Sequence, residues 1–390
     1  MKLLASLITL ALAVSSIAAP AAEAVDAVNA SALESRAPAN FVGVSGTRFT
    51  LNGARYTVVG GNAYWIGLTG LSPANMNAAF ADIAKAGGTT VRTWGFNEVT
   101  NQNGNWLQSW SGNKATINNA GLQNFDNVVA AAKANGIRLI VALTNNWADY
   151  GGMDVYVRQI ANSNNHDLFY TNNDIQTAFK AYIKTFVGRY VNEPTIMAWE
   201  LANEPRCKGS TGATSGSCTT ATITNWAKSI SAYIKSIDPN HLVALGDEGF
   251  FNKPGSPTYP YQGGEGIDFD ANLAISTLDF GTFHSYPGSW GQGANPQAWG
   301  TQWITDHAAS QNRLNKPVII EEFGVTSNQA TVYTAWFNQI VSSGLAGDLI
   351  WQSGSHLSSG NTPNDGYAVY PDHPVYPLLT SHAKALKARG

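Results

Sequence analysis

The chain has 390 residues, 44% of them hydrophobic, which is enough to bury a sizeable core without additional cross-links and excludes a generally disordered chain. Only 13% of the residues are charged, and 23 basic against 26 acidic side chains leave no excess of positive charge for binding nucleic acid or an anionic membrane. The 12 tryptophans, 15 tyrosines and 15 phenylalanines suit loops that place flat aromatic faces beside hydrogen-bonding groups, as sugar-binding sites do.

The first twenty residues have the pattern of a secretory signal peptide. Lys2 precedes an apolar run from Leu3 to Val14 and a small-residue segment at 15–19, and the run is short for a membrane span. We therefore expect a cleaved signal at 1–19 and an extracellular, secreted protein. Residues 20–36 are alanine-rich without an apolar period, which indicates a short leader or a disordered tail that stays attached. No later run is long and apolar enough to span a bilayer, so no membrane association is expected.

The region that follows predicts an α/β barrel. Two alternating segments from residue 41 meet at Asn52-Gly53, a dipeptide that favours a β-hairpin. Eight buried-strand patterns then alternate with amphipathic helical segments. We expect residues 37–390 to form a single (β/α)8 TIM-barrel catalytic domain with an N-terminal β-hairpin. No G-x-G-x-x-G turn supports a doubly wound sheet instead. The expected strands cover 56–65, 89–96, 137–147, 196–205, 242–251, 279–287, 317–324 and 347–354.

The cysteines and histidines indicate a disulfide and no metal centre. Cys207 and Cys218 flank a Gly/Ser/Thr-rich segment, and in an oxidising compartment they are expected to form a disulfide that closes this loop. None of the seven histidines has the spacing of H-E-x-x-H or a comparable motif. A serine-hydrolase G-x-S-x-G elbow is also absent. The sequence therefore predicts neither a cofactor nor a metal.

Carboxylates lie where the fourth and seventh expected strands end. Glu204 ends one run, and Glu321 and Glu322 lie near the end of the other. In such barrels the active site is at the carboxyl ends of the strands. Glycoside hydrolysis needs two carboxylates there, one to protonate the leaving oxygen and one to attack or to activate water. A salt bridge or a helix cap is the alternative for any single glutamate.

The segments WELANEPR, with Glu204, and VIIEEFG, with Glu322, resemble the two signature motifs of glycoside hydrolase family 5. TVRTWGF, LTNNWADYGG, GDEGFF, FHSYPGSWG and WQSGSH extend the resemblance over the whole mature chain, which is similar to the fungal endo-β-1,4-mannanases of that family. The resemblance implies hydrolysis of internal bonds in mannan, galactomannan and glucomannan. It also implies a retaining double displacement, with the carboxyl groups about 5–5.5 Å apart.

The resemblance implies that Glu204 is the acid/base and Glu322 the nucleophile, whose negative charge would raise the pKa of Glu204. Because neighbouring strand residues point to opposite faces, only one of Glu321 and Glu322 is expected to enter the mouth. Glu321 is the alternative nucleophile, or else the partner in an internal salt bridge.

The other site residues implied by the resemblance surround this pair. Arg92 would bond the nucleophile and lower its pKa, Asn203 would bond the sugar 2-hydroxyl, and Tyr286 and His284 would contact the nucleophile and the acid/base region. Expected contacts with substrate further along the cleft come from Trp351 as a platform, Trp147, Arg206 on the leaving-group side, Tyr64, Trp65 and Glu248.

Two other functions remain open from the sequence. Cellulases and exo-acting β-glucanases use the same fold and both glutamates. A secreted carbohydrate-binding protein could keep the barrel and lose the chemistry, although such a protein would be expected to lack a glutamate or Arg92, and this chain has all three. Without coiled-coil heptads or a long exposed apolar helix, we expect a monomer whose partner is the polysaccharide.

Overall fold

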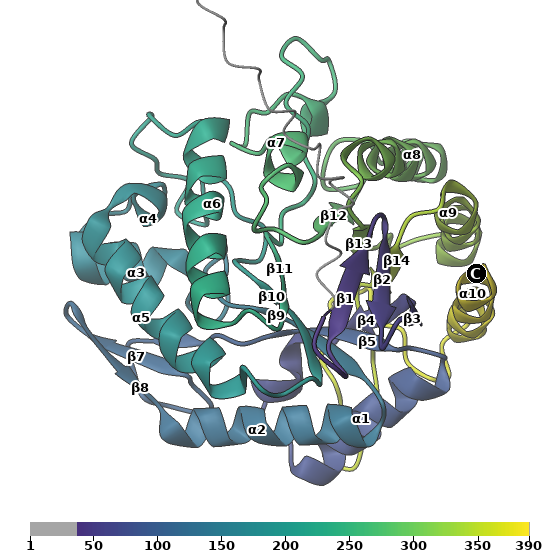
Figure 1. Cartoon of the computed structure of the whole chain (residues 1–390), viewed down its shortest axis with the longest axis horizontal. Helices are drawn as coiled ribbons and strands as arrows, with labels where there is room; N and C mark the ends of the chain where they lie inside the picture. Colours follow the sequence, from purple (N-terminus) through teal and green to yellow (C-terminus); the bar gives the residue numbers. More distant parts are fainter. Residues whose placement is uncertain (1–36, 390) are drawn as a thin grey trace, which may run out of the picture. The chain divides into compact units, whose positions relative to one another are not determined.

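The computed structural model describes residues 37–389, so the expected signal peptide and leader lie outside the described residues. Its core is an eight-stranded sheet in the order β11-β10-β9-β5-β4-β14-β13-β12, surrounded by helices (Figure 1). All seven neighbouring pairs are parallel. The Asp279 amide donates to the Val243 carbonyl (2.8 Å) and the His284 amide to the Glu248 carbonyl (3.2 Å), which links the two edges. The predicted (β/α)8 barrel is confirmed.

The barrel strands all lie within the predicted ranges and are shorter than them. They are almost entirely buried, because helices cover the outer face and side chains fill the interior. The residues that end each predicted range leave the sheet and form the loops at its carboxyl edge. The strands are β4 (Val58–Asn62), β5 (Thr90–Trp94), β9 (Arg138–Ala142), β10 (Ile196–Glu200), β11 (Leu242–Ala244), β12 (Gly281–Ser285), β13 (Val318–Phe323) and β14 (Gly347–Ile350).

Local signals in the sequence set the bounds of several helices. The Ser72 hydroxyl accepts a hydrogen bond from the Asn75 amide (3.2 Å), with Pro73 as the first helical residue of α1. Helix α2 ends just before Gly136, with Lys133 in its last turn. The helices are α1 (Pro73–Lys85), α2 (Asn119–Ala134), α3 (Met153–Ala161), α4 (Leu168–Thr171), α5 (Asn173–Tyr190), α6 (Thr220–Ile237), α7 (Phe269–Leu273), α8 (Pro296–Leu314), α9 (Gln329–Ser343) and α10 (Tyr376–Ala388). None of the helices in the described part is long and apolar enough to cross a membrane.

The N-terminal hairpin is part of a three-stranded antiparallel sheet, β1 (Val42–Ser45), β2 (Arg48–Leu51) and β3 (Ala54–Tyr56). Asn52-Gly53 joins β2 to β3 as predicted, but a second turn at Gly46 adds β1. Val42 and Phe49 pack in one apolar cluster with residues at the beginnings of barrel strands, among them Val58, Leu242 and Ile319. The small sheet thus closes the amino end of the barrel and leaves the carboxyl ends of the strands for the site.

Short strands in two loops at the carboxyl end were not expected from the sequence. The loop after β5 forms a sheet of β6 (Glu98–Val99), β7 (Gln108–Ser111) and β8 (Lys114–Ile117), and the loop after β14 forms the pair β15 (His356–Leu357) and β16 (Gly360–Asn361). The strands of these two loops have only two to four residues each. That is too short for the alternation of side chains to be recognised in the sequence.

The expected disulfide is present between Cys207 and Cys218, whose Cα atoms are 5.6 Å apart. It closes the loop that leads from the end of β10 to α6, directly after Arg206. Closing a loop of this length restricts the unfolded chain and contributes on the order of 3 kcal/mol to stability.

Replacing both Cys207 and Cys218 with serine should lower the free energy of unfolding by about 2–4 kcal/mol, because the unfolded chain regains the entropy of the open loop. Denaturant unfolding of the double variant and of the parent protein under oxidising conditions measures this difference. Equal stability of the two proteins would contradict the expectation.

Candidate active site

The guanidinium of Arg92 lies at the centre of the polar groups inside the barrel mouth. Arg92 is on β5 and has no exposed surface. Its Nε donates to Glu200 (2.8 Å), one terminal nitrogen donates to Asn62 (3.2 Å) and to Glu322, and the other donates to Asn203 (2.9 Å). Arg92 therefore joins the ends of β4, β10 and β13 and holds its carboxylate partners at fixed positions.

Glu204 follows β10 and reaches the mouth through an unusual backbone conformation. Its φ is 50°, in the left-handed region that non-glycine residues seldom adopt. The Glu204 amide donates to the Gly246 carbonyl (2.8 Å), which holds this conformation from the neighbouring strand end. The carboxylate accepts hydrogen bonds from Trp147 Nε1 (2.5 Å) and His284 Nδ1 (2.7 Å). Its side chain keeps 12% exposure, which leaves it accessible to a substrate.

Both tandem glutamates of β13 contact Arg92, which corrects the prediction that they point to opposite faces. The ladder between β12 and β13 shifts register, so that Phe283 pairs with Ile320 and His284 with Glu322. Glu321 is thus the extra residue of a bulge, and the alternation of side chains is interrupted there. Glu322 borders the cleft, whereas Glu321 is completely buried and ion-paired with Arg92.

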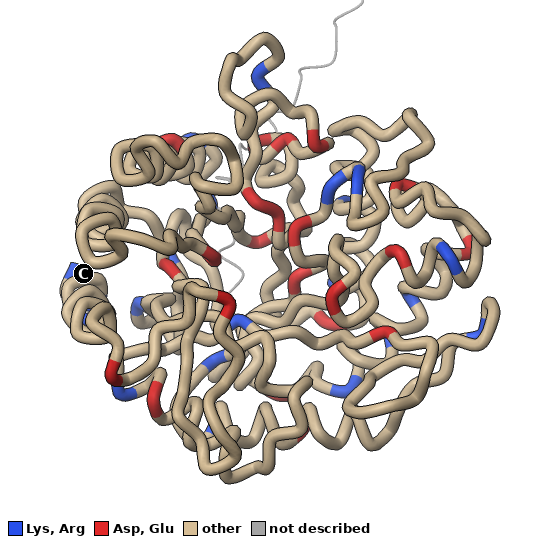
Figure 2. Tube along the Cα trace, turned by 180° about the vertical axis from the view of Figure 1, so that it is seen from behind, with Lys and Arg blue, Asp and Glu red and all other residues tan. Residues whose placement is uncertain are grey.

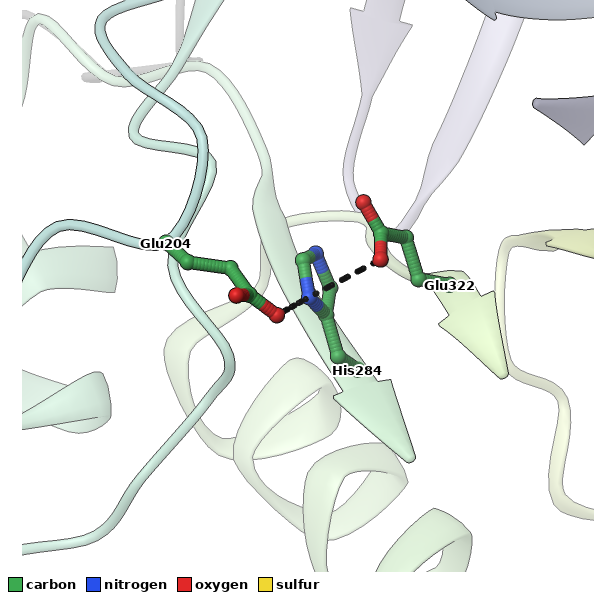
Figure 3. A group of neighbouring side chains, drawn as sticks. All are labelled: Glu204, His284 and Glu322. Carbon is green, nitrogen blue, oxygen red and sulfur yellow. Dashed lines mark hydrogen bonds and ion pairs between the residues drawn. The ribbon is translucent and has the colours of Figure 1, made fainter. Parts of the chain in front are cut away.

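His284 of β12 lies between the two carboxylates that face the mouth (Figure 3). Its Nδ1 is 2.7 Å from Glu204 and 3.6 Å from Glu322, and its Nε2 is 3.3 Å from Glu321. On the far side, the Tyr286 hydroxyl donates to Glu322 (2.8 Å). An oxygen of Glu204 and an oxygen of Glu322 lie within 4.8 Å of each other.

Acidic residues gather near the barrel axis (Figure 2), and burial and charged neighbours shift the pKa values of Glu204, Glu322 and His284. Burial alone would raise the pKa of Glu204, but the hydrogen bond and charge of His284, together with the charge of Arg206, lower it to about 2. Burial raises the pKa of Glu322, and the charges of His284 and Arg92 offset this only in part. Burial would lower the pKa of His284, but the surrounding carboxylates raise it well above its ordinary value. The charge of Glu322 was expected to raise the pKa of Glu204. In the structure His284 lowers that pKa and outweighs this effect.

The ligand atoms of Glu204, His284 and Glu322 are close enough together for a cation in principle. However, both ring nitrogens of His284 already face carboxylates, and each carboxylate already receives hydrogen bonds. Hydrogen bonds alone thus satisfy the three side chains. Two carboxylates in this arrangement can supply an acid/base and a nucleophile without a bound cation.

A cleft of about 490 Å³ opens above the two carboxylates and is lined by aromatic residues together with polar and charged ones. Trp351, which follows β14, stacks on Tyr64 (ring centroids 5.3 Å apart) and donates from Nε1 to Asp365 (2.7 Å). Flat, partly exposed rings of this kind match the apolar faces of sugars. The cleft residues are Trp94, Asn145, Trp147, Asp149, Asn203, Glu204, Arg206, Glu248, Tyr259, Tyr286, Ser289, Trp290, Glu322, Trp351 and Tyr367.

Arg206 and Glu248 form one wall of this cleft. Two guanidinium nitrogens of Arg206 donate to the Glu248 carboxylate (2.5 and 2.6 Å), and a third contact goes to the Tyr259 hydroxyl (3.0 Å). The guanidinium also lies over the ring of Trp147, 5.2 Å from its centroid. This wall presents a positive group beside an aromatic face.

Most residues singled out from the sequence lie in or directly beneath the cleft. Trp65 is the exception: it is completely buried in a 3-10 turn after β4, and its indole donates to Gln352 (3.0 Å). The expectation that it lines the cleft is wrong, because the turn directs Tyr64 and Trp65 to different sides. Sequence reasoning assigned no role to Trp94 and Trp290, although they lie within the segments TVRTWGF and FHSYPGSWG. It missed Tyr259 and Tyr367, which come from loops without a distinctive motif. It also missed Glu200, hidden in the buried strand that precedes Asn203-Glu204.

Comparisons with known proteins agree with this geometry. The family model described as Cellulase (glycosyl hydrolase family 5) matches residues 59–357. Mannan endo-1,4-beta-mannosidase A of Podospora anserina is 45% identical over 354 residues, covering 88% of this chain and 91% of the relative. The enzyme of that name from Aspergillus aculeatus is 42% identical, covering 90% and 91%. The crystal structure of an endo-1,4-beta-mannanase from Rhizomucor miehei superposes with a TM-score of 0.83 at 41% identity, covering 89% and 99%.

Gly246→Ala should destabilise the protein, since Gly246 has φ of 85° and an added Cβ would lie 2.0 Å from the Ala202 carbonyl oxygen. We expect a loss of about 3 kcal/mol or more in the free energy of unfolding. Gly136→Ala is the matched control, because its φ is 68° but the space around it is open; it should cost only about 1–2 kcal/mol. Denaturant unfolding measures both losses. Equal losses of unfolding free energy in the two variants would contradict the expected clash with the Ala202 carbonyl.

Proposed function

Because this chain belongs to glycoside hydrolase family 5, a conclusion carried by the match over residues 59–357, we propose that it is a secreted endo-β-1,4-mannanase. The observation that carries the chemistry is the approach of Glu204 and Glu322 within 4.8 Å on opposite sides of the mouth. Retaining glycosidases hold their carboxyl groups about 5–5.5 Å apart, whereas inverting enzymes leave about 6.5–9.5 Å for a water molecule. The similarity to proteins named as mannan endo-1,4-beta-mannosidases supports the substrate class.

In the first step, Glu322 attacks the anomeric carbon and Glu204 protonates the leaving oxygen, which breaks the glycosidic bond and leaves the sugar covalently bound to Glu322. Arg92 and Tyr286 direct the Glu322 oxygens and stabilise the ionised nucleophile. Asn203 faces the sugar from beside Glu204, held by Arg92 (2.9 Å) and by its own donation to Asn145 (3.0 Å). In this position its amide bonds the sugar 2-hydroxyl.

In the second step, Glu204 takes a proton from water, the water oxygen attacks the anomeric carbon, and Glu322 leaves as a carboxylate. We infer that Glu204 and His284 hold the acid proton jointly, because Glu204 Oε1 and His284 Nδ1 are 2.7 Å apart and each group shifts the pKa of the other. In the unliganded protein the proton resides on His284 Nδ1. It moves along this hydrogen bond to Glu204 when a leaving oxygen approaches.

The cleft accommodates sugars on both sides of the scissile bond. Trp351, stacked on Tyr64, forms the platform under the sugar that becomes attached to Glu322. Trp147 and Arg206 extend the leaving-group side, where the bond from Trp147 to Glu204 also fixes the acid. Glu248, held by Arg206, accepts a hydrogen bond from a sugar hydroxyl. The open ends of such a cleft suit internal cleavage of mannan, galactomannan and glucomannan.

We also propose how the chain is processed and in which oligomeric state it acts. Residues 1–19 are removed as a signal peptide, residues 20–36 are a leader or tail, and residues 37–390 form the catalytic domain. The disulfide between Cys207 and Cys218 is consistent with an oxidising extracellular location. The protein acts as a monomer, and its partner is the polysaccharide.

Glu322→Ala and Glu204→Ala should each lower hydrolysis of mannohexaose and galactomannan by several orders of magnitude, because each removes a group that takes part in bond cleavage. The wild type should release mannobiose and mannotriose. Product chromatography with both substrates, and with carboxymethylcellulose in parallel, measures this. Preferential release of glucose oligomers would instead indicate a cellulase, and full activity of Glu322→Ala would move the nucleophile to Glu321.

Activity should follow a bell-shaped pH profile with its maximum on the acidic side of neutral. The acidic limb reflects protonation of Glu322 and should lie above the ordinary glutamate value, because burial raises the pKa of this carboxyl. On the alkaline limb, the Glu204–His284 pair loses its proton. His284→Asn should move the acidic limb to higher pH, because the charge of His284 lowers the pKa of Glu322. A profile that is flat from about pH 4 to about pH 9 would contradict the assignment.

A further inference from the structure

A second pair of carboxyl groups, Glu200 and Glu321, lies beneath the catalytic pair and has no exposed surface. One oxygen of Glu200 accepts from Arg92 Nε (2.8 Å), and one oxygen of Glu321 faces His284 Nε2 (3.3 Å). Within the described part of the chain, the other oxygen of each has no hydrogen-bond donor. The two side chains nevertheless lie within hydrogen-bonding reach of each other. Glu321 Oε2 has only an ion pair with Arg92 Nε at 3.5 Å, and Glu200 Oε1 has no partner among the described residues. A proton held between the two carboxyl groups supplies the donor that both oxygens lack.

We propose that Glu200 and Glu321 share one proton, carried on Glu200 and donated to Glu321, and that this protonated pair positions Arg92 and His284 for the reaction. This role deepens the proposed function and rests on it, whereas the sharing of the proton is a property of the unliganded protein. Both unpartnered oxygens are satisfied by the same hydrogen atom. Arg92 keeps its bond to Glu200 because a neutral carboxyl still offers an acceptor oxygen.

The balance of charges inside the barrel favours this proton. With the four glutamates Glu200, Glu204, Glu321 and Glu322 ionised and His284 protonated, four negative charges would oppose two positive ones at the mouth and directly beneath it. One shared proton reduces the excess from two negative charges to one. The charged groups around the pair come from three strands and two segments that follow strands: Arg92 on β5, His284 on β12, Glu322 on β13, Glu204 after β10 and Asp247 after β11.

The directions in which the pKa values of Glu200 and Glu321 are shifted agree with a proton on Glu200. Burial raises the pKa of Glu200 well above its ordinary value, and the nearby charge of Glu321 adds to this effect. Burial would also raise the pKa of Glu321, but the charge of Arg92 and the hydrogen bond with Glu200 lower it to about 2. The pair therefore divides into a neutral donor and an anionic acceptor.

This division gives each member a different effect on the catalytic groups. Neutral Glu200 fixes the Arg92 guanidinium without cancelling its charge, which remains available to Glu322. Anionic Glu321 keeps His284 protonated and directs its Nδ1 toward Glu204. Glu200 and Glu321 thus act through Arg92 and His284 and are positioning residues, not groups that contact the substrate.

Infrared spectroscopy of the unliganded protein tests the shared proton directly. Above about pH 9 the other buried carboxyl groups with raised pKa values are ionised, namely Glu98 (pKa about 8), Asp247 and Glu248 (both about 7) and the nucleophile Glu322. The carbonyl stretch of a protonated carboxyl should persist there in the wild type and disappear in Glu200→Gln. Glu98→Gln is the matched control and should leave this band in place. Absence of the band from the wild type, or its survival in Glu200→Gln, would overturn the proposal whether or not the protein hydrolyses mannan.

The pH dependence of hydrolysis tests the positioning role. An amide at position 200 reproduces the neutral carboxyl, since it accepts from Arg92 and donates to Glu321. Glu200→Gln should keep both limbs of the profile within about 0.3 pH of the wild type, whereas Glu200→Ala should lower kcat/KM by at least about tenfold. Recovery by glutamine of most of the activity lost in the alanine variant supports the role. A shift of more than about 0.5 pH in the acidic limb of Glu200→Gln would show that Glu200 is normally ionised and would overturn it.

Discussion

The site depends on the buried guanidinium of Arg92. It contacts a carboxyl or amide from three other strand ends and a second carboxylate of β13, and so joins several parts of the mouth. Burying one cation among several acids is tolerated because each of its three nitrogens has a partner. The same contacts that satisfy Arg92 fix where Glu322 and Asn203 lie. The contacts that stabilise the charged interior are therefore the same contacts that set the geometry of the site.

The barrel positions the residues that make these contacts. The N-terminal sheet packs on the beginnings of the strands, so their carboxyl ends remain the open end. Local irregularities then direct the functional groups. A left-handed backbone at Glu204 brings its carboxylate to His284, and a bulge at Glu321 brings both carboxylates of β13 to Arg92. Departures from regular strand geometry thus coincide with the residues that carry the chemistry.

Much of this could be predicted from the sequence, for identifiable reasons. Buried parallel strands have continuous apolar runs, and every barrel strand lay within its predicted range. Glu204 and Glu322 could be found because they lie in recognisable motifs at strand ends. The bulge could not be predicted, because the alternation rule that separates Glu321 from Glu322 assumes regular pairing. Trp65 was misplaced because a short 3-10 turn, invisible in the hydrophobic pattern, buries its ring against Gln352. Glu200 looked like part of an ordinary buried strand, since its role depends on contacts with β5 and β13.

The central claim is that Arg92 and Tyr286 hold Glu322, and not its neighbour Glu321, as the nucleophile. The most direct test is to trap the covalent intermediate with a 2-deoxy-2-fluoro-β-mannosyl fluoride and to identify the labelled peptide by tandem mass spectrometry. The account predicts a single mannosyl label on Glu322 that is absent from Glu322→Ala. A label on Glu321, or turnover of the unmodified substrate with inversion and without a trapped intermediate, would contradict it.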